Sequence, residues 1–180
     1  MIPKALRHLK TINRHKRMVM EYCFRVGLYR QGLLHDLSKY SPTEFLVGAK
    51  YYQGNRSPNN AEREAVGVST SWLHHKGRNR HHFEYWIDYS LESNQVIMGA
   101  PMPRRYVAEM AMDRISASRN YMGEAYTDSA PLEYYRRGAE SMWFVHPQTK
   151  RDLEKILTIL AEKGEEAMIR YVKYQYLKGN

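Results

Sequence analysis

The chain has 180 residues and a formal net charge of +9 at neutral pH. This length fits one domain that buries its own core, and no apolar run is long enough for a transmembrane helix. The single cysteine excludes an intrachain disulfide and a thiolate-rich metal centre. Because the first residues also lack the apolar core of a signal peptide, we expect a cytoplasmic protein without a membrane partner.

The excess of 28 Lys and Arg over 19 Asp and Glu predicts attraction to anions. These cations are dispersed along the chain, without a run of five or six. An anionic small-molecule substrate is therefore favoured, while nucleic acid is a less favoured partner. A homo-oligomer is compatible with the sequence.

Apolar residues recur at helical spacing through almost the whole chain. Gly27 is expected to end the first helix, and Ser41-Pro42-Thr43-Glu44 forms a capping box with proline at the first helical position. The expected helices cover residues 3–24, 28–37, 41–52, 62–75, 104–121, 131–144, 149–163 and 165–177. Strand signals are absent. We predict an all-α fold, a single-domain helical bundle over residues 1–180.

A His-Asp pair ends an apolar run in the segment Leu33-Leu34-His35-Asp36-Leu37-Ser38-Lys39. Neither an imidazole nor a carboxylate is cheap to bury alone, which suggests a metal site. Neighbours on a helix diverge by about 100°. The pair can therefore bind metal only from a helix end, or by ligating two adjacent ions.

Other candidate ligands lie before and after this pair. His15 interrupts a helix of good helix formers, and His75 is separated from His81-His82 by a glycine-containing turn that can bring them together. Asp113 lies on an otherwise apolar helix face, where a carboxylate needs a cation or hydrogen bonds.

Neighbouring histidines leave alternatives. His8 lies one heptad before His15 and is the other candidate first ligand, although we expect it at the surface or behind the ligands. His74 is expected to be a bystander beside His75. Both His81 and His82 would ligate in a two-metal site, whereas one of them would contact a ligand or the substrate in a one-metal site.

The ordered set His15, His35-Asp36 and Asp113, with further histidines between, resembles the HD superfamily of metal-dependent phosphohydrolases. Residues 34–39 resemble its LHDIGK segment, and residues 103–115 resemble the helix that supplies the last Asp. The chain most resembles a little-characterised family of small bacterial and phage HD-related proteins. The resemblance covers about residues 8–121, and a helical extension over about 131–178 adds nothing to it. The Gly-Tyr-Pro loop of HD-GYP phosphodiesterases is missing, so cyclic dinucleotide hydrolysis is not implied.

The resemblance implies a metal-dependent phosphohydrolase acting on a phosphomonoester, phosphodiester or nucleotide. It implies one or two divalent transition metal ions, since mixed nitrogen and oxygen ligands suit Mn, Fe, Co, Ni or Zn. The metal ligands would be His15, His35, Asp36, His75, His81, His82 and Asp113.

Four further residues are candidates for contacts with the substrate. Lys39 has a position similar to that of the phosphate-contacting lysine of HD enzymes, and Glu84 is a candidate general acid or base. Arg78 and Arg80 are candidates for binding a phosphate. Two rival functions are an HD-type di-iron oxygenase and a non-catalytic metal-bound module that binds a nucleotide or nucleic acid.

Overall fold

A computed structural model describes residues 3–92 and 94–178 of the chain, which are mostly helical. This confirms the predicted all-α fold. The helices are α1 (Lys4–Arg25), α2 (Tyr29–Leu34), α3 (Pro42–Tyr51), α4 (Pro58–Val66), α5 (Thr70–Lys76), α6 (Arg104–Met122), α7 (Ala130–Gly138) and α8 (Pro147–Tyr171). Short 3-10 turns cover Leu37–Tyr40, Phe83–Trp86 and Gly123–Ala125, and a π-helical turn covers Val172–Tyr176.

Helix α6 is the centre of the hydrophobic core. It contacts α1, α7 and α8, and consecutive residues from Val107 to Met112 are buried. Ile115 on α6 and Leu157 on α8 have no exposed surface. Burying each such side chain stabilises the fold by roughly 1.5–3 kcal/mol. The helix that supplies Asp113 is thus held by apolar contacts on several sides.

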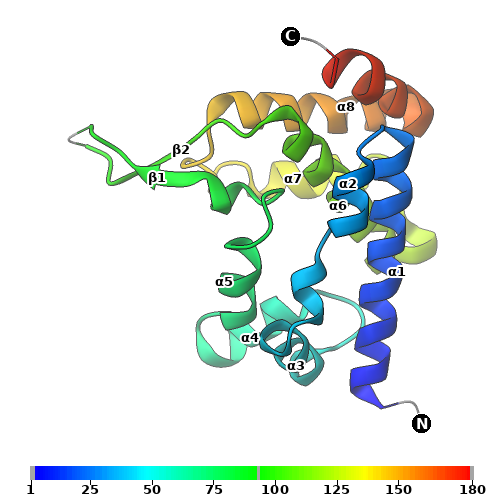
Figure 1. The fold of residues 1–180 in the computed structure, drawn as a ribbon, viewed down its shortest axis with the longest axis vertical. Coiled ribbons are helices and arrows are strands. Elements are labelled where there is room, and N and C mark those ends of the chain that lie inside the picture. Colours follow the sequence, from blue (N-terminus) through cyan, green and yellow to red (C-terminus); the bar gives the residue numbers. More distant parts are fainter. Residues whose placement is uncertain (1–2, 93, 179–180) are drawn as a thin grey trace.

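The shorter helices α3, α4 and α5 gather beside the N-terminal half of α1 (Figure 1). A buried carboxylate, Glu62, joins the last two of them. Its Oε1 accepts from the Thr70 backbone N–H at 3.0 Å, and its Oε2 accepts from the Ser69 hydroxyl at 2.6 Å. Because these bonds anchor the first turn of α5, they also fix the helix that carries His75 in its last turn.

Three predicted boundaries are wrong. Residues 62–75 are two helices, because Gly67 has φ +81° and ends α4. The segment predicted as a helix over 28–37 stops being α-helical at Leu34, and the helix predicted over 131–144 ends at Gly138. The predicted break between the last two helices is present as a kink, since Gly164 has φ +79° inside α8.

The structure also contains two strands where none was expected. β1 (Ile87–Tyr89) and β2 (Ile97–Gly99) form an antiparallel hairpin that projects from the helices (Figure 1). Each strand has three residues, too few for a clear alternating pattern in the sequence. The base of the hairpin is tightly packed: a Cβ on Gly99 would collide with the backbone of Phe144 and His146.

Among the described residues, the helices are either too short or too polar to cross a membrane.

Candidate metal centre

The site begins where the chain leaves α2. His35 is extended, with φ −53° and ψ 129°, and Asp36 adopts the left-handed conformation with φ +53°. Asp36 is the only residue other than glycine with positive φ in the described part of the chain. Asp tolerates this conformation better than most residues. Because the helix has ended, the two neighbouring side chains converge, and His35 Nε2 lies 3.2 Å from Asp36 Oδ2.

Four side chains form a first group of potential ligands: His15, His35, Asp36 and Asp113. They come from α1, the segment after α2, and α6. Asp113 Oδ1 lies 2.9 Å from His15 Nε2 and 3.6 Å from His35 Nε2. The four ligand atoms all lie within 4.8 Å of one another, close enough to share one ion.

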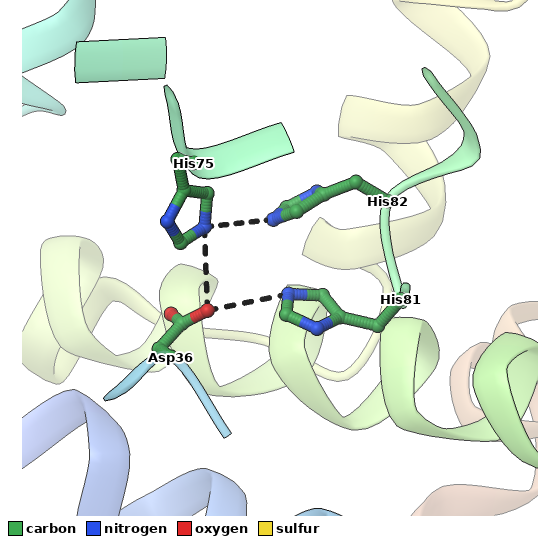
Figure 2. Close-up of side chains that lie close together, drawn as sticks. All are labelled: Asp36, His75, His81 and His82. Atoms are coloured by element: carbon green, nitrogen blue, oxygen red, sulfur yellow. Dashed lines mark hydrogen bonds and ion pairs between the residues drawn. The ribbon is translucent and has the colours of Figure 1, made fainter. Parts of the chain in front are cut away.

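A second group comprises Asp36, His75, His81 and His82, whose rings and carboxylate point toward one another in Figure 2. His75 Nε2 lies 3.2 Å from Asp36 Oδ1, and His81 Nε2 lies 3.4 Å from the same oxygen. The Nε2 atoms of His75 and His82 are 2.9 Å apart. His75 lies in the last turn of α5, and the other two histidines lie in the loop that follows it.

Asp36 belongs to both groups, with Oδ2 facing the first and Oδ1 facing the second. The structure therefore brings together all seven residues that the sequence singles out as metal ligands. Five of their buried atoms make no regular hydrogen bond, namely Nε2 of His15, His35 and His81 and both carboxylate oxygens of Asp36, although Lys39 Nζ forms an ion pair with Asp36 Oδ2. Buried polar atoms without partners are costly. A cation would satisfy them, and these buried groups could hold a metal ion.

A buried carboxylate behind the ligands connects the two groups. Glu109 Oε1 accepts from His35 Nδ1 at 3.0 Å and lies 3.2 Å from His81 Nδ1. Because Nδ1 of each of these two imidazoles is turned toward Glu109, its Nε2 faces the centre. Glu109 lies within residues 103–115, but the sequence pattern assigns it no role. Its position four residues before Asp113, on the same face of α6, is the signal that could have identified it.

Glu44 contacts Nδ1 of His75 in the same way as Glu109 contacts Nδ1 of His35, and the sequence pattern does not identify it either. Its Oε2 lies 2.8 Å from His75 Nδ1, while Oε1 lies 2.6 Å from Nδ1 of the bystander His74. Glu44 lies in the first turn of α3, where its backbone N–H donates to the Ser41 side chain. The Ser41 cap is present, but the Glu44 carboxylate does not complete a capping box, because it contacts the histidines and orients a candidate ligand.

Electrostatics keep the carboxylates ionised. Burial alone would raise the pKa of Asp36, but His35 and Lys39 outweigh it and hold that pKa well below the usual range. For Asp113, burial is likewise outweighed by the nearby imidazoles of His15 and His35, so its pKa is also well below normal. Burial lowers the pKa of His15, which favours the neutral imidazole that binds metals. For His35 and His75, burial also lowers the pKa, but the attraction of Asp36 outweighs it and their pKa values are raised.

Lys39 lies beside the shared carboxylate, with Nζ 2.5 Å from Asp36 Oδ2. Burial lowers the pKa of Lys39, but the attraction of Asp36 and Asp113 outweighs it and the pKa is raised. The side chain is 30% exposed, so Lys39 lies at the border between the centre and solvent.

Residues 4–159 match the Family of unknown function (DUF5662), and this range includes both ligand groups. The chain belongs to this family. The DUF5662 match extends beyond residues 8–121, to which the sequence motifs were confined. No curated protein and no solved structure matches the chain.

In this DUF5662 chain, His15 and not His8 reaches the centre. The expectation that His8 lies at the surface or directly behind the ligands is wrong. It is 6% exposed and packs against the rings of Phe45 and Tyr52, outside both ligand groups. Gly48 makes room for it, since a Cβ there would collide with the imidazole.

The remaining predicted residues lie outside the ligand groups. Arg78 and Arg80 are exposed: Arg78 donates to the His74 carbonyl at 3.3 Å, and Arg80 donates to the Tyr106 hydroxyl at 3.4 Å. Neither contacts the centre. Glu84 is mostly buried, burial raises its pKa, and its Oε2 has no partner.

Proposed function

We propose that this protein is a metal-dependent phosphohydrolase with a dinuclear centre, related to the HD superfamily. One observation carries the proposal: the two oxygens of Asp36 face two separate sets of imidazole nitrogens. A carboxylate in that position suits a bridge between two ions, and a purely structural ion pair would not need five histidines around it.

The donor set fits such ions. His15, His35, Asp36 and Asp113 would hold one ion, and the second would be held by Asp36, His75, His81 and His82. Imidazole and carboxylate ligands suit Mn, Fe, Co, Ni or Zn. Ions held in this way lower the pKa of bound water toward neutrality and neutralise charge on phosphoryl oxygens.

The chain's own residues supply the rest of the chemistry. Glu109 and Glu44 hold the imidazoles of His35, His81 and His75 through their Nδ1 atoms, so the ligand atoms need not reorient when substrate binds. Lys39 keeps its charge and reaches solvent beside Asp36, where it can donate to a phosphoryl oxygen. The net charge of +9 favours the approach of an anionic substrate.

Hydrolysis assays test this proposal. Protein loaded separately with Mn, Fe, Co, Ni or Zn would be offered p-nitrophenyl phosphate, bis(p-nitrophenyl) phosphate and a panel of nucleotides. We expect metal-dependent release of product, abolished in Asp36→Asn. Failure of every metal form to hydrolyse any member of the panel would count against a phosphohydrolase.

The main rival function is that of a di-iron oxygenase that uses the same ligands. The five histidines among the seven candidate ligands are also compatible with two iron ions. Iron-loaded protein prepared without oxygen would then change its absorption spectrum when oxygen is admitted. Salt-dependent binding of a nucleotide or nucleic acid without turnover would instead indicate a non-catalytic module.

A further inference from the structure

A cavity of about 320 Å³ lies where the start of α6 meets the C-terminal end of the described chain. This volume is in the range of small-molecule sites. The cavity is lined by Arg104, Asp152, Lys155, Tyr171, Gln175 and Tyr176. None of these residues belongs to a ligand group of the metal centre, and Arg104 precedes Asp113 by roughly 13 Å along α6.

The π-helical turn that follows α8 makes the aromatic wall of this cavity. On an α-helix, residues five apart diverge by about 140°. Here the helix widens, and the Leu177 backbone N–H donates to the Val172 carbonyl at 3.0 Å. The rings of Tyr171 and Tyr176 are therefore stacked, with centres 6.2 Å apart and planes at 28°. π-helical turns of this kind frequently occur at functional sites.

Two cations lie against these two rings. Lys155 Nζ is 5.1 Å from the centre of the Tyr171 ring, and Arg104 Cζ is 5.7 Å from that of the Tyr176 ring. Arg104 also donates to the Tyr176 carbonyl at 3.3 Å, which ties α6 to the π-helical turn. No hydrogen bond or ion pair joins the Lys155 ammonium to another described residue, so its donors are available to a ligand.

One carboxylate lines the cavity, and both of its oxygens already accept hydrogen bonds. The Tyr176 hydroxyl donates to Asp152 Oδ2 at 2.9 Å, and Gln148 Nε2 donates to Oδ1 at 2.5 Å. The two cations in the cavity wall thus outnumber the acidic groups, which favours an anion. Tyr176 is buried and Tyr171 is partly exposed, so Tyr171 is the ring that a planar ligand can reach.

We propose that this cavity binds a small planar aromatic anion, with its ring packed against Tyr171 and its oxyanion held by Lys155 and Arg104. Nucleoside monophosphates and aromatic carboxylates share this chemistry. The inference goes beyond the proposed function, because it uses no residue of the metal centre. It also gives a role to the end of the chain, since Tyr171 lies outside the residues 4–159 that match the family.

Calorimetry on the full chain tests the ligand class. The four nucleoside monophosphates AMP, GMP, CMP and UMP would be compared with benzoate and indole-3-acetate, which are aromatic carboxylates. Adenosine, which lacks the anion, and ribose 5-phosphate, which lacks the aromatic ring, are the controls. We expect at least one aromatic anion to bind tenfold or more tightly than both controls, and the tightest ligand identifies which of the two sources the site takes.

Substitutions in the cavity wall test the residues. Tyr171→Leu and Lys155→Gln should each weaken binding of the tightest ligand at least fivefold, because one removes the stacking surface and the other removes a cation. The matched controls Tyr174→Leu and Lys163→Gln alter exposed residues outside the cavity and should change binding less than twofold. Lys155 is exposed, so Lys155→Gln covers the case in which Tyr171→Leu does not fold.

The same titration in Asp36→Asn separates this cavity from the metal centre, because binding at the cavity should be retained there. The proposal is overturned if no aromatic anion binds more tightly than adenosine and ribose 5-phosphate, or if either folded cavity variant binds as its control does. Loss of binding in Asp36→Asn would also overturn it, since the ligand would then occupy the metal centre. No ligand has to react in these titrations, so their result is independent of every hydrolysis assay.

Discussion

His35 and Asp36 are neighbours in the chain, yet their side chains meet, with Nε2 and Oδ2 3.2 Å apart. On a regular helix they would diverge by about 100°. The convergence arises because α2 ends at Leu34 and Asp36 takes a left-handed backbone conformation. For most residues that conformation costs about 1–2 kcal/mol, a cost that Asp and Asn reduce by local hydrogen bonding. Strained positions of this kind cluster at functional sites.

Replacing Asp36 by Asn should remove metal binding without unfolding the chain. Asn also tolerates positive φ, but it lacks the negative charge that both ligand groups share. We expect elemental analysis to find less than half the metal content of the unaltered protein. Asp88→Asn, at an exposed carboxylate on β1, is the matched control and should keep full occupancy. Normal metal content in Asp36→Asn would contradict the bridging role.

Single substitutions should separate the two ligand groups. His15→Gln removes a ligand only from the first group, and His82→Gln removes one only from the second. If the centre is dinuclear, each variant should lose about one ion per chain while the other is retained, as measured by metal analysis after gel filtration. Loss of all metal in both variants, or of none in either, would argue against two separable positions.

Glu109→Gln should weaken both positions together. The carboxylate contacts Nδ1 of His35 from the first group and of His81 from the second. Removing a hydrogen-bonding partner of this kind typically costs 10–100-fold in metal affinity. Competition with a chelator of known affinity would measure the change, with Glu140→Gln, an exposed residue after α7, as the control. An affinity equal to that of the control would show that Glu109 does not support the ligands.

His8 should make folding stability depend on pH between about 4 and 6.5. Burial, with a smaller contribution from Lys39, lowers the pKa of His8 to about 4. In that interval His8 binds a proton in the unfolded chain but not in the folded chain. The contribution of neutral His8 to the free energy of unfolding is therefore fully present above pH 6.5. That contribution, up to about 3 kcal/mol, is lost as the pH falls toward 4.

Urea unfolding of the unaltered protein and of His8→Leu at pH 7 and pH 4 would measure this contribution. Between pH 7 and pH 4, we expect the free energy of unfolding of the unaltered protein to fall by about 3 kcal/mol more than that of the variant. Comparing the two proteins cancels the titration of carboxylates that both contain. Parallel losses in the two proteins would show that His8 is protonated in the folded state.

Gly99→Ala should destabilise the fold although the change is a single methyl group. The added Cβ would collide with the Phe144 carbonyl and the His146 backbone nitrogen, which cannot move without shifting the loop before α8. Overpacking of this kind typically costs about 1–3 kcal/mol. Gly77→Ala is the control, because Gly77 has a right-handed helical conformation and its Cβ would have room. Equal melting temperatures for the two variants would contradict the tight packing of the hairpin.

The sequence predicted most of the helices because apolar spacing and terminators act locally. The helix start capped by Ser41 and the break at Gly164 are both present, since a cap or a glycine determines the backbone around it. The two strands were missed because three residues are too few for a period-two pattern. The split at Gly67 was missed because a glycine within an otherwise helical pattern does not by itself reveal a left-handed conformation.

The sequence by itself determined the helical class and the residues with metal-binding chemistry. Buried imidazoles and carboxylates need partners wherever they lie, so the residue types and apolar surroundings marked His35-Asp36 and Asp113 as candidates, and the resemblance to the HD superfamily added His15 to the set. Only the tertiary structure decided that Asp36 faces two groups, that His8 lies apart, and that Glu109 and Glu44 stand behind the histidines. The reason is physical: these relationships depend on where separate helices pack and on one left-handed backbone angle, neither of which local spacing encodes.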